Sequence, residues 1–347
     1  MLTMLINRIN NVLSFEYLRC RTRNYIKSNE FLINPNTIFI ICLPATDYYY
    51  LPYFQLYKYK NVIVNFSYIN SNTYFSRLKD MILRNSKYRK YSEIKYDKAK
   101  EYIFFFDGQY TICSRELRLF LKKKYANCKI IFHLGDLIGT KKGIKIDDIK
   151  GFADLVVTYD HNDADKNGLT YHSDPYSKLP AEMFEQTNYK SQILFYGLAK
   201  NRAKELILIY DKLKSSNMKC EFCIPDLCDD YLGSRPELAN AKYTPYLDYL
   251  KRVQNTQCLL EIIQKGSRGC TFRTWEAVVY NKKLITNNPS IREEAFYNPL
   301  YIQVIDSVDS LDVDWITKDV NVDYGYTEQL SPKACFEFYL DEIKKNI

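Results

Sequence analysis

A glycine-containing loop in the second half of the chain could bind an anionic ligand. Residues 256–288 have the pattern of an apolar strand, this loop, a helix and a second strand. Gly266 and Gly269 permit tight turns of the backbone beside a ligand. The loop would bring backbone N–H groups and a helix N-terminus to one point, which favours negative charge there. Arg268 and Arg273 flank that point, so we expect a site for phosphate groups.

The elements that must position this loop alternate between strands and helices along the whole chain. In the first half, the expected strands are 37–43, 61–66, 102–106, 129–133 and 155–159, and the expected helices are 73–83 and 113–125. In the second half, the expected strands are 193–196, 219–224, 258–263, 283–286 and 301–305, and the expected helices are 202–213, 246–253, 271–280 and 332–346. This alternation predicts an α/β protein with mostly parallel sheets, which bind ligands beyond the carboxyl ends of their strands.

The chain is long enough for two domains of ordinary size, because it has 347 residues. The alternation stops at residues 173–190, which contain two prolines and many polar residues, so we interpret this segment as a linker. We predict a first domain at residues 1–180, a second at 181–332, and a final helix at 333–347.

Three segments resemble the bacterial cell-surface polysaccharide glycosyltransferases of the GT-B fold, which assemble lipopolysaccharide and capsule. They are TQCLLEIIQKGSRGCTFRTWEAVVYNKKLITNN at 256–288, QILFYGLAKNRAKELILIYDKLKSSNMKCEFCI at 192–224, and a region within 130–180 that begins IIFHLGDLIG and includes GFADLVVTYDHNDADKNGLTYHSDPYS. The resemblance covers about half of the chain. It implies two Rossmann-like domains whose mostly parallel sheets face a central cleft, with the last helix returning to the first domain.

The resemblance also implies which residues bind a nucleotide-sugar donor. Glu276 would accept hydrogen bonds from the two ribose hydroxyl groups. Arg202, which follows the turn at Gly197, and Arg273 would neutralise the leaving phosphates. Glu261 would bind the donor sugar or cap the loop. The diphosphate would meet the amides and hydroxyl groups of the loop, which are those of Gly266, Ser267, Gly269, Cys270 and Thr271.

Each donor residue also has a structural interpretation. Glu276 could interact with the dipole of its helix or form a salt bridge, and either arginine could be an ordinary surface cation. The two glutamates, Glu261 and Glu276, lie further apart than the pair that the large retaining families carry. Retention and inversion of the sugar configuration therefore both remain open.

Candidate bases for the acceptor hydroxyl follow strands of the first domain. Asp136 is the first choice and His133 the second, because both follow residues 129–132 at the carboxyl end of that strand. Asp107 holds an equivalent place after the strand 102–106. Each of these residues could instead cap a turn. His161 and His172 are expected at the surface.

The charge of the chain is unevenly placed. Residues 1–190 contain 29 Lys and Arg against 19 Asp and Glu, whereas the remaining residues contain 20 against 22. A basic first half suits a glycan or lipid-linked acceptor that carries phosphate, or an anionic membrane surface. An N-terminal amphipathic helix could make such a peripheral contact through Leu2, Leu5, Ile9 and Leu13. No zinc-finger, basic-zipper or RNP pattern supports nucleic acid as a partner.

The sequence indicates no metal site and no cofactor. Cys220, Cys223 and Cys228 lack a fourth ligand at finger-like spacing. The two Asp-x-Asp motifs, 163–165 and 312–314, are expected to face solvent in a helix and in a loop. Ten cysteines without a signal peptide favour a reducing cytoplasm, at the inner face of the membrane if the amphipathic helix binds there.

These observations predict a metal-independent glycosyltransferase that moves a sugar from a nucleotide-sugar donor to a growing cell-surface polysaccharide or a lipid-linked acceptor. Two alternatives stay open. One is a non-catalytic protein that keeps the GT-B fold and binds a nucleotide or a glycan. The other is a sugar-nucleotide epimerase of the same architecture, which would turn over its donor without an acceptor.

Overall fold

The computed structural model describes residues 35–43, 53, 61–66, 91, 94–108, 113–139, 145–184, 190–233, 235–238 and 244–345. Two predicted features lie outside these residues: the N-terminal amphipathic helix and the helix at 73–83. The chain forms two compact units. The first comprises Met1–Tyr159, Asp163–Pro175 and Leu330–Ile347, and the second comprises Asp160–Asn162 and Tyr176–Gln329.

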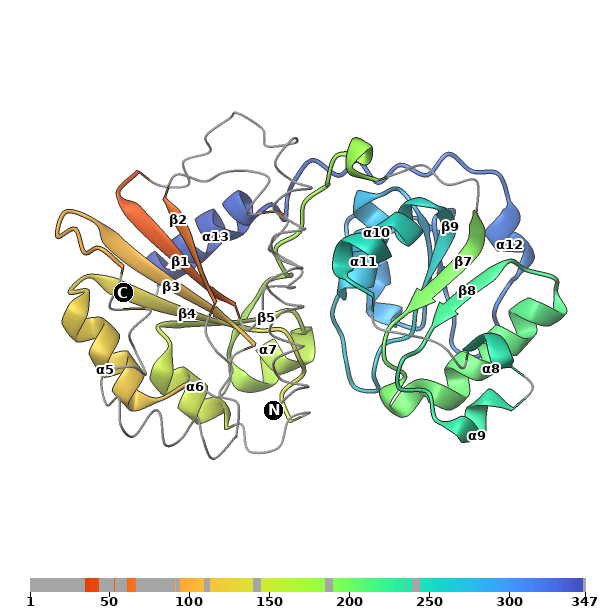
Figure 1. Ribbon diagram of the computed structural model, residues 1–347, viewed down its shortest axis with the longest axis horizontal. Helices are drawn as coiled ribbons and strands as arrows, with labels where there is room; N and C mark the ends of the chain where they lie inside the picture. The colour runs from red at the N-terminus through yellow and green to blue at the C-terminus, as the bar shows by residue number, and fades with distance from the viewer. Residues whose placement is uncertain are drawn as a thin grey trace, which may run out of the picture. The chain divides into compact units, whose positions relative to one another are not determined.

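The first unit contains a six-stranded parallel sheet (Figure 1). In spatial order its strands are β2 (Val62–Phe66), β1 (Thr37–Leu43), β3 (Glu101–Asp107), β4 (Cys128–Leu134), β5 (Leu155–Thr158) and β6 (Thr170–Tyr171). In chain order, the helices that accompany this sheet are α5 (Arg115–Lys124), α6 (Ile146–Phe152), α7 (His161–Asn167) and α13 (Pro332–Lys345). All of the strand pairs are parallel, as expected where helices connect successive strands.

Alternate residues of β3 pack against different helices. Phe104 and Phe106 belong to the core cluster that includes Leu117 and Leu121 of α5 and Phe152 of α6. Phe105 points the other way, where it packs against two aromatic residues of α13, Phe336 and Tyr339, with ring centroids 5.4 and 5.8 Å apart. The nearly continuous apolar sequence of β3 therefore reflects burial on both faces of the sheet.

The second unit contains a five-stranded parallel sheet. In spatial order its strands are β11 (Ile302–Val304), β10 (Lys283–Thr286), β9 (Thr256–Glu261), β7 (Ser191–Tyr196) and β8 (Cys220–Cys223). The helices are α8 (Ala203–Ser215), α9 (Asp229–Leu232), α10 (Tyr246–Gln254), α11 (Phe272–Val279) and α12 (Asp314–Thr317). Short 3-10 turns lie at Ala181–Met183, Lys200–Arg202, Pro236–Leu238 and Pro289–Glu293.

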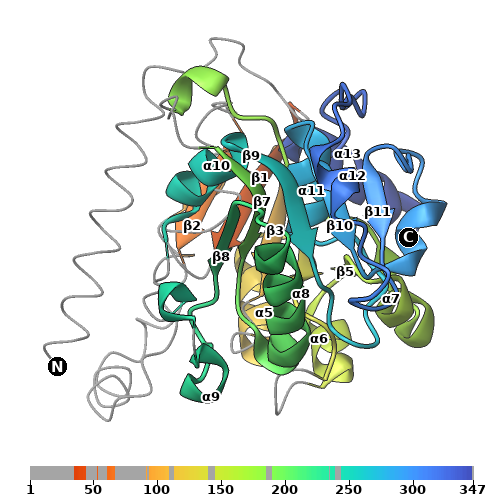
Figure 2. The same ribbon diagram turned by 90° about the vertical axis from the view of Figure 1, so that its right-hand side faces the viewer.

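Helices cover both faces of this second sheet. The side chains of α8 and α12 share one core cluster with Phe195 of β7, Leu260 of β9 and Ile285 of β10. The helices α10 and α11 lie on the opposite side of the sheet (Figure 1), and α8 lies in front of it in Figure 2. These two parallel sheets with their helices confirm the predicted α/β class.

Both units have the same strand order. If the strands of each unit are numbered from 1 in chain order, both sheets have the spatial order 2-1-3-4-5. The first sheet has a sixth strand after the fifth. In such a doubly wound sheet the connections reverse direction between the first and third strands, and ligands bind beyond the carboxyl ends of the strands at that point. The reversal lies between β1 and β3 in the first unit and between β7 and β9 in the second.

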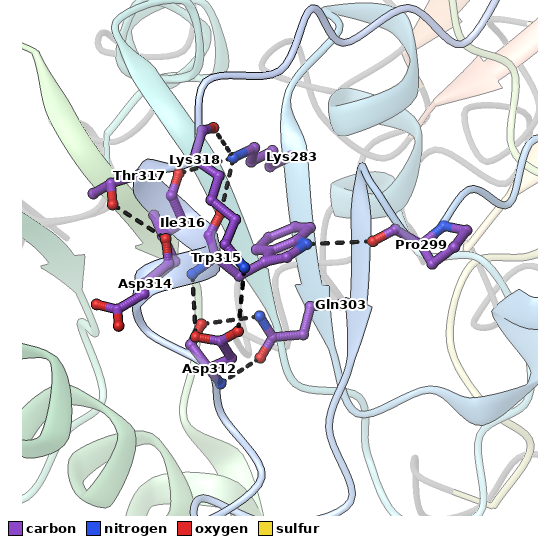
Figure 3. Close-up of polar contacts among 9 residues, drawn as sticks. All are labelled: Lys283, Pro299, Gln303, Asp312, Asp314, Trp315, Ile316, Thr317 and Lys318. Atoms are coloured by element: carbon purple, nitrogen blue, oxygen red, sulfur yellow. Dashed lines mark hydrogen bonds and ion pairs between the residues drawn. The ribbon is translucent and has the colours of Figure 1, made fainter.

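A buried lysine fastens α12 to the second sheet (Figure 3). The Nζ of Lys283 donates hydrogen bonds to the carbonyl oxygens of Trp315 at 2.8 Å, Ile316 at 3.1 Å and Lys318 at 2.5 Å. It also lies 5.0 Å from the centre of the Trp315 ring. Carbonyl groups at a helix C-terminus attract a cation, because they carry the negative end of the helix dipole. The second Asp-x-Asp motif is not wholly in a loop, since Asp314 begins this helix.

We expect Lys283→Met to lower the free energy of unfolding by about 2 kcal/mol, because it leaves the carbonyl groups without their charged donor. Urea denaturation of the full-length protein measures this. Lys318→Met is the matched control, since its ammonium group is exposed and forms an ion pair with Asp312 at 3.9 Å. A loss for Lys283→Met no greater than for the control would contradict the anchoring role.

Among the described residues, no helix is both long enough and apolar enough to cross a membrane.

Candidate donor site

The two loops at the reversal point of the second sheet contain most of the predicted donor residues. One loop follows β7 and runs from Gly197 to Arg202, and the other follows β9 and leads to α11. Because β7 and β9 are parallel neighbours, both loops leave the same edge of the sheet. Residues that are far apart in the sequence therefore lie close together at the reversal point, where the topology of the sheet favours a ligand.

Arg202 is held in place by backbone carbonyl groups from both loops. Its Nε donates to Ala199 O at 3.2 Å, one terminal nitrogen donates to Leu198 O at 2.5 Å, and the other donates to Ile262 O. Burial, followed by the charge of Arg273, lowers the pKa of Arg202 to about 10. The guanidinium group is therefore fixed and remains positively charged at neutral pH.

Arg273, in the first turn of α11, reaches back to β7. Its guanidinium group donates a hydrogen bond to Tyr196 O and lies 5.0 Å from the centre of the Phe195 ring. Gly197 permits this approach, because a Cβ atom there would lie 2.9 Å from a terminal nitrogen of Arg273. The backbone of Gly197 also has a φ of +153°, which few other residues adopt.

These two arginines act on each other as like charges, although the carboxylates of Asp226, Glu261 and Glu205 act on Arg202 and that of Glu276 acts on Arg273. Neither guanidinium group forms an ion pair with a carboxylate in the part of the chain that the structure describes. Burial is the main cause of the lowered pKa of Arg202, and repulsion by the like charge of Arg273 adds to it. A bound dianion would remove this repulsion, so the pair is suited to phosphate groups.

Glu261 holds the elements around the arginines together. Its carboxylate is fully buried and accepts hydrogen bonds from three threonine hydroxyl groups. The donors are Thr274 and Thr286, each at 2.7 Å, and Thr271 at the N-terminus of α11. Of the two predicted roles, this geometry favours capping of the loop over contact with a sugar.

The glycine-containing loop places its donors differently from the prediction. Ser267 Oγ and the backbone N–H of Arg268 both donate to the buried carboxylate of Asp160, at 2.8 and 2.6 Å. Gly269 is buried, and its carbonyl group accepts a hydrogen bond from Asn288 at 3.1 Å. The thiol of Cys270 is buried beside Glu294, and burial raises its pKa.

Two more of the predicted loop residues have positions suited to shaping the loop. Gly266 has a φ of +88°, which favours glycine. The side chain of Thr271 caps α11 by accepting a hydrogen bond from the N–H of Arg273 at 3.2 Å. In this arrangement, carboxylates already accept hydrogen bonds from two of the donors that were assigned to the diphosphate, the hydroxyl groups of Ser267 and Thr271.

Glu276 is buried beneath tyrosines of α10. One carboxylate oxygen accepts a hydrogen bond from Tyr249 at 2.5 Å, and the other accepts one from Tyr246 at 3.4 Å. Tyr246 also donates to the hydroxyl oxygen of Tyr176 at 2.9 Å. Burial raises the pKa of Glu276 to about 7, although Arg273 and the two tyrosines oppose the shift. Phenol hydroxyl groups thus occupy the positions that the prediction gave to ribose.

In the first unit, His133 lies between two carboxylates. Its Nδ1 lies 2.7 Å from Asp107 Oδ1, and its Nε2 lies 3.2 Å from Asp174 Oδ1. All three residues are buried. Burial opposes the charged imidazolium, but the charge of Asp174 and the hydrogen bond to Asp107 outweigh it, so the pKa of His133 is raised. With a carboxylate at each ring nitrogen and no exposed surface, His133 and Asp107 are poorly placed to meet an acceptor.

The other candidates of the first domain differ in exposure. Asp136 is partly exposed after β4, which suits a base better than the buried His133. His172 is not a surface residue, because its ring packs 4.4 Å from Phe338 and burial lowers its pKa to about 4. His161 is partly exposed, as predicted. Asp163 of the first Asp-x-Asp motif accepts a hydrogen bond from the N–H of Ile138 at 2.8 Å, so it does not simply face solvent.

Sequence reasoning missed several residues that shape the site. Asp226 accepts hydrogen bonds from the N–H groups of Ala199 and Lys200, at 2.6 and 3.1 Å, and so fixes the loop after β7. Its position after the strand β8 was the available signal, because that strand neighbours β7. The spacing of residues in the sequence gave no sign of two other sets of contacts. These are the contacts of Asp160 with the loop and those of Tyr246 and Tyr249 with Glu276.

Comparison with protein-family models finds no match to this chain, and comparison with curated proteins finds none. Three solved structures overlap with it at low identity. A protein from Listeria monocytogenes assigned as a UDP-N-acetylglucosamine 2-epimerase is 10% identical with a TM-score of 0.37, over 70% of this chain and 74% of the other.

The second is the glycosylation-associated Gap123 complex of Streptococcus agalactiae, at 10% identity and a TM-score of 0.40, over 75% of this chain and 54% of the other. The third is a UDP-forming α,α-trehalose-phosphate synthase from Burkholderia xenovorans, at 9% identity and a TM-score of 0.40, over 79% and 76%. Overlaps of this extent assign neither a family nor an activity to the chain.

Proposed function

We propose that this protein is a glycosyltransferase of the GT-B type that transfers a sugar from a nucleotide-sugar donor. The observation that carries the proposal is the pair of guanidinium groups, Arg202 and Arg273, that backbone carbonyl groups hold in place at the reversal point of the second sheet. A sugar linked to a nucleoside diphosphate brings two phosphate groups, whose charge matches two fixed guanidinium groups.

The proposed chemistry follows from where charge develops. When the bond between the sugar and the diphosphate breaks, negative charge increases on the leaving phosphate oxygen. Guanidinium groups that are already in position stabilise this charge without reorganising, which lowers the barrier. Arg202 and Arg273 would supply this stabilisation in place of a metal ion, so the proposed transfer requires no cofactor.

The ribose of the donor would bind at Glu276. For this contact, ribose hydroxyl groups exchange with the phenol hydroxyl groups of Tyr246 and Tyr249, which now hold the carboxylate. Such an exchange conserves the number of hydrogen bonds to Glu276 and keeps the buried carboxylate satisfied. Because Tyr249 also interacts with Arg273, the ribose and diphosphate contacts would form together.

The acceptor would be a glycan or a lipid-linked saccharide of a cell-surface polysaccharide. Asp136 is the base that we assign to the first unit, since it is partly exposed at the carboxyl end of the sheet. The excess of basic residues in the first half of the chain suits an acceptor that carries phosphate. A cytoplasmic location with peripheral contact to an anionic membrane belongs to the same proposal.

A single assay series separates this proposal from the two alternatives. The full-length protein is incubated with uridine, guanosine, thymidine and cytidine diphosphate sugars and with monophosphate sugars, after thermal shifts have selected those that bind. Products are identified by mass spectrometry and NMR with and without a mixture of lipid-linked acceptors.

We expect nucleotide release that rises by at least about 100-fold when the correct acceptor is present, because binding energy of the acceptor positions its hydroxyl group for attack. Conversion of the donor to its epimer without an acceptor would instead establish the epimerase. A stabilised protein without turnover of any donor would establish the non-catalytic binder. The absence of any shift with nucleotides would reject the donor site itself.

A further inference from the structure

The buried cluster in the first unit has the composition of a metal site. Asp107, His133 and Asp174 each offer a ligand atom, and these atoms lie within 4.8 Å of one another. Asp107 ends β3, and His133 is its register partner on β4, so the two side chains share one face at the carboxyl edge of the sheet. The three residues are far apart in sequence, which is why no motif revealed them.

Two further buried oxygen atoms lack hydrogen-bond partners among the described residues. They are Oδ2 of Asp107 and the hydroxyl group of Tyr339, and both residues are fully buried. Tyr339 lies near the cluster, because its ring and the ring of His133 both pack against Phe105. Unpaired buried polar atoms are costly, so these two point to a bound species.

The charge of the cluster points to a cation. The carboxylates of Asp107 and Asp174 lie against the two ring nitrogens of His133, so the cluster offers oxygen and imidazole ligand atoms at one point. With a divalent cation and a neutral imidazole, the same three residues become electrically neutral.

We propose that His133 and Asp174 bind a divalent transition-metal ion in the first unit, with Asp107 behind the imidazole ring of His133. Nε2 of His133 and the carboxylate of Asp174 are the ligands. Their separation of 3.2 Å is close to the roughly 3.4 Å expected for two ligands at about 2.1 Å from a tetrahedral ion. Asp107 accepts the Nδ1 proton and fixes the ring, as carboxylates do behind metal-bound histidines.

The two unpaired oxygen atoms complete this arrangement. Water molecules fill the remaining coordination positions. Asp107 Oδ2 accepts a hydrogen bond from these waters, and the Tyr339 hydroxyl group forms a hydrogen bond with them. One imidazole with carboxylate and water oxygens suits Zn²⁺, Mn²⁺ or Co²⁺ rather than a soft, thiolate-binding ion.

Metal titration of the full-length protein tests the proposal. The protein is treated with EDTA and dialysed, and ZnCl₂ is then titrated into it by calorimetry. Asp174→Asn and His133→Gln remove ligands at nearly constant shape, and Asp147→Asn on the exposed side of α6 is the matched control. Far-UV circular dichroism verifies that each variant is folded.

We expect one Zn²⁺ per chain, affinity at least about tenfold weaker in both ligand variants, and unchanged affinity in the control. No binding to the parent protein, or equal affinity in the parent and Asp174→Asn, would overturn the proposal. If the ligand variants fail to fold, the visible spectrum of the Co²⁺-loaded parent decides. Intense bands of a four-coordinate ion support the site, and a spectrum like that of aqueous Co²⁺ rejects it.

Discussion

We expect Arg273→Met to weaken the binding of a nucleoside diphosphate by about 100-fold or more, because the substitution removes one charge-assisted partner of the phosphates. The diphosphate is chosen as the one that most stabilises the parent protein. Calorimetry on the full-length chain measures the affinity. Arg202→Met should have an effect of similar size, and the double variant should retain no measurable diphosphate binding.

The uncharged nucleoside of the same base separates loss of charge from loss of structure. Its affinity should be unchanged in Arg273→Met, since we propose that the guanidinium group binds the phosphates and not the base. Arg292→Met, a change of the same type at an exposed position, should alter neither affinity. Equal losses for the nucleoside and the diphosphate would show that the substitution acts through folding.

The second large effect concerns pH and stability. Burial raises the pKa of Glu276 to about 7, well above its ordinary value of 4.5. The folded state therefore holds this proton more tightly than the unfolded chain does. The resulting stabilisation is fully present below pH 4.5 and is lost as the pH rises through about 7.

Glu276→Gln removes this titration while keeping the shape of the side chain. Between pH 5 and pH 8, the free energy of unfolding of the parent should fall by ~2–3 kcal/mol more than that of the variant. Urea denaturation at several pH values gives the comparison. Parallel pH profiles for the two proteins would contradict the raised pKa of Glu276.

The pattern of apolar residues predicted every strand that the structure describes in the two sheets except β6. The strands predicted at 37–43 and 283–286 have the bounds of β1 and β10, and the helix predicted to begin at Tyr246 is α10. Strands buried on both faces are continuous apolar runs bounded by polar residues, so their signal is local. The ends of the strands were predicted less accurately. For example, β9 begins two residues before the predicted strand.

The site depended on contacts between distant residues, and spacing does not encode these. The sequence predicted an accessible Glu276, but Tyr246 and Tyr249 of another helix cover it. It also treated His133 as a base, without any indication that Asp174 would approach it from beyond β6. Arg202 and Arg273 were predicted more successfully as neighbours, because each follows a strand at the same edge of one sheet.

The threonine network around Glu261 shows the same limitation. Thr271 and Thr274 lie one turn apart on α11, which was foreseeable from the helix alone. Thr286 joins them only because β10 pairs with β9 in a register that places it beside Glu261. Without that register, a carboxylate at a strand end could equally be a ligand for a sugar.

Hydrogen–deuterium exchange of the full-length protein, with and without its preferred nucleotide-sugar, tests the donor site most directly. We predict slower exchange of backbone amides at residues 197–202 and 266–273, because bound phosphates immobilise both loops at the reversal point of the second sheet. Unchanged exchange in both loops at a saturating ligand concentration, with protection confined to other segments, would contradict the assignment.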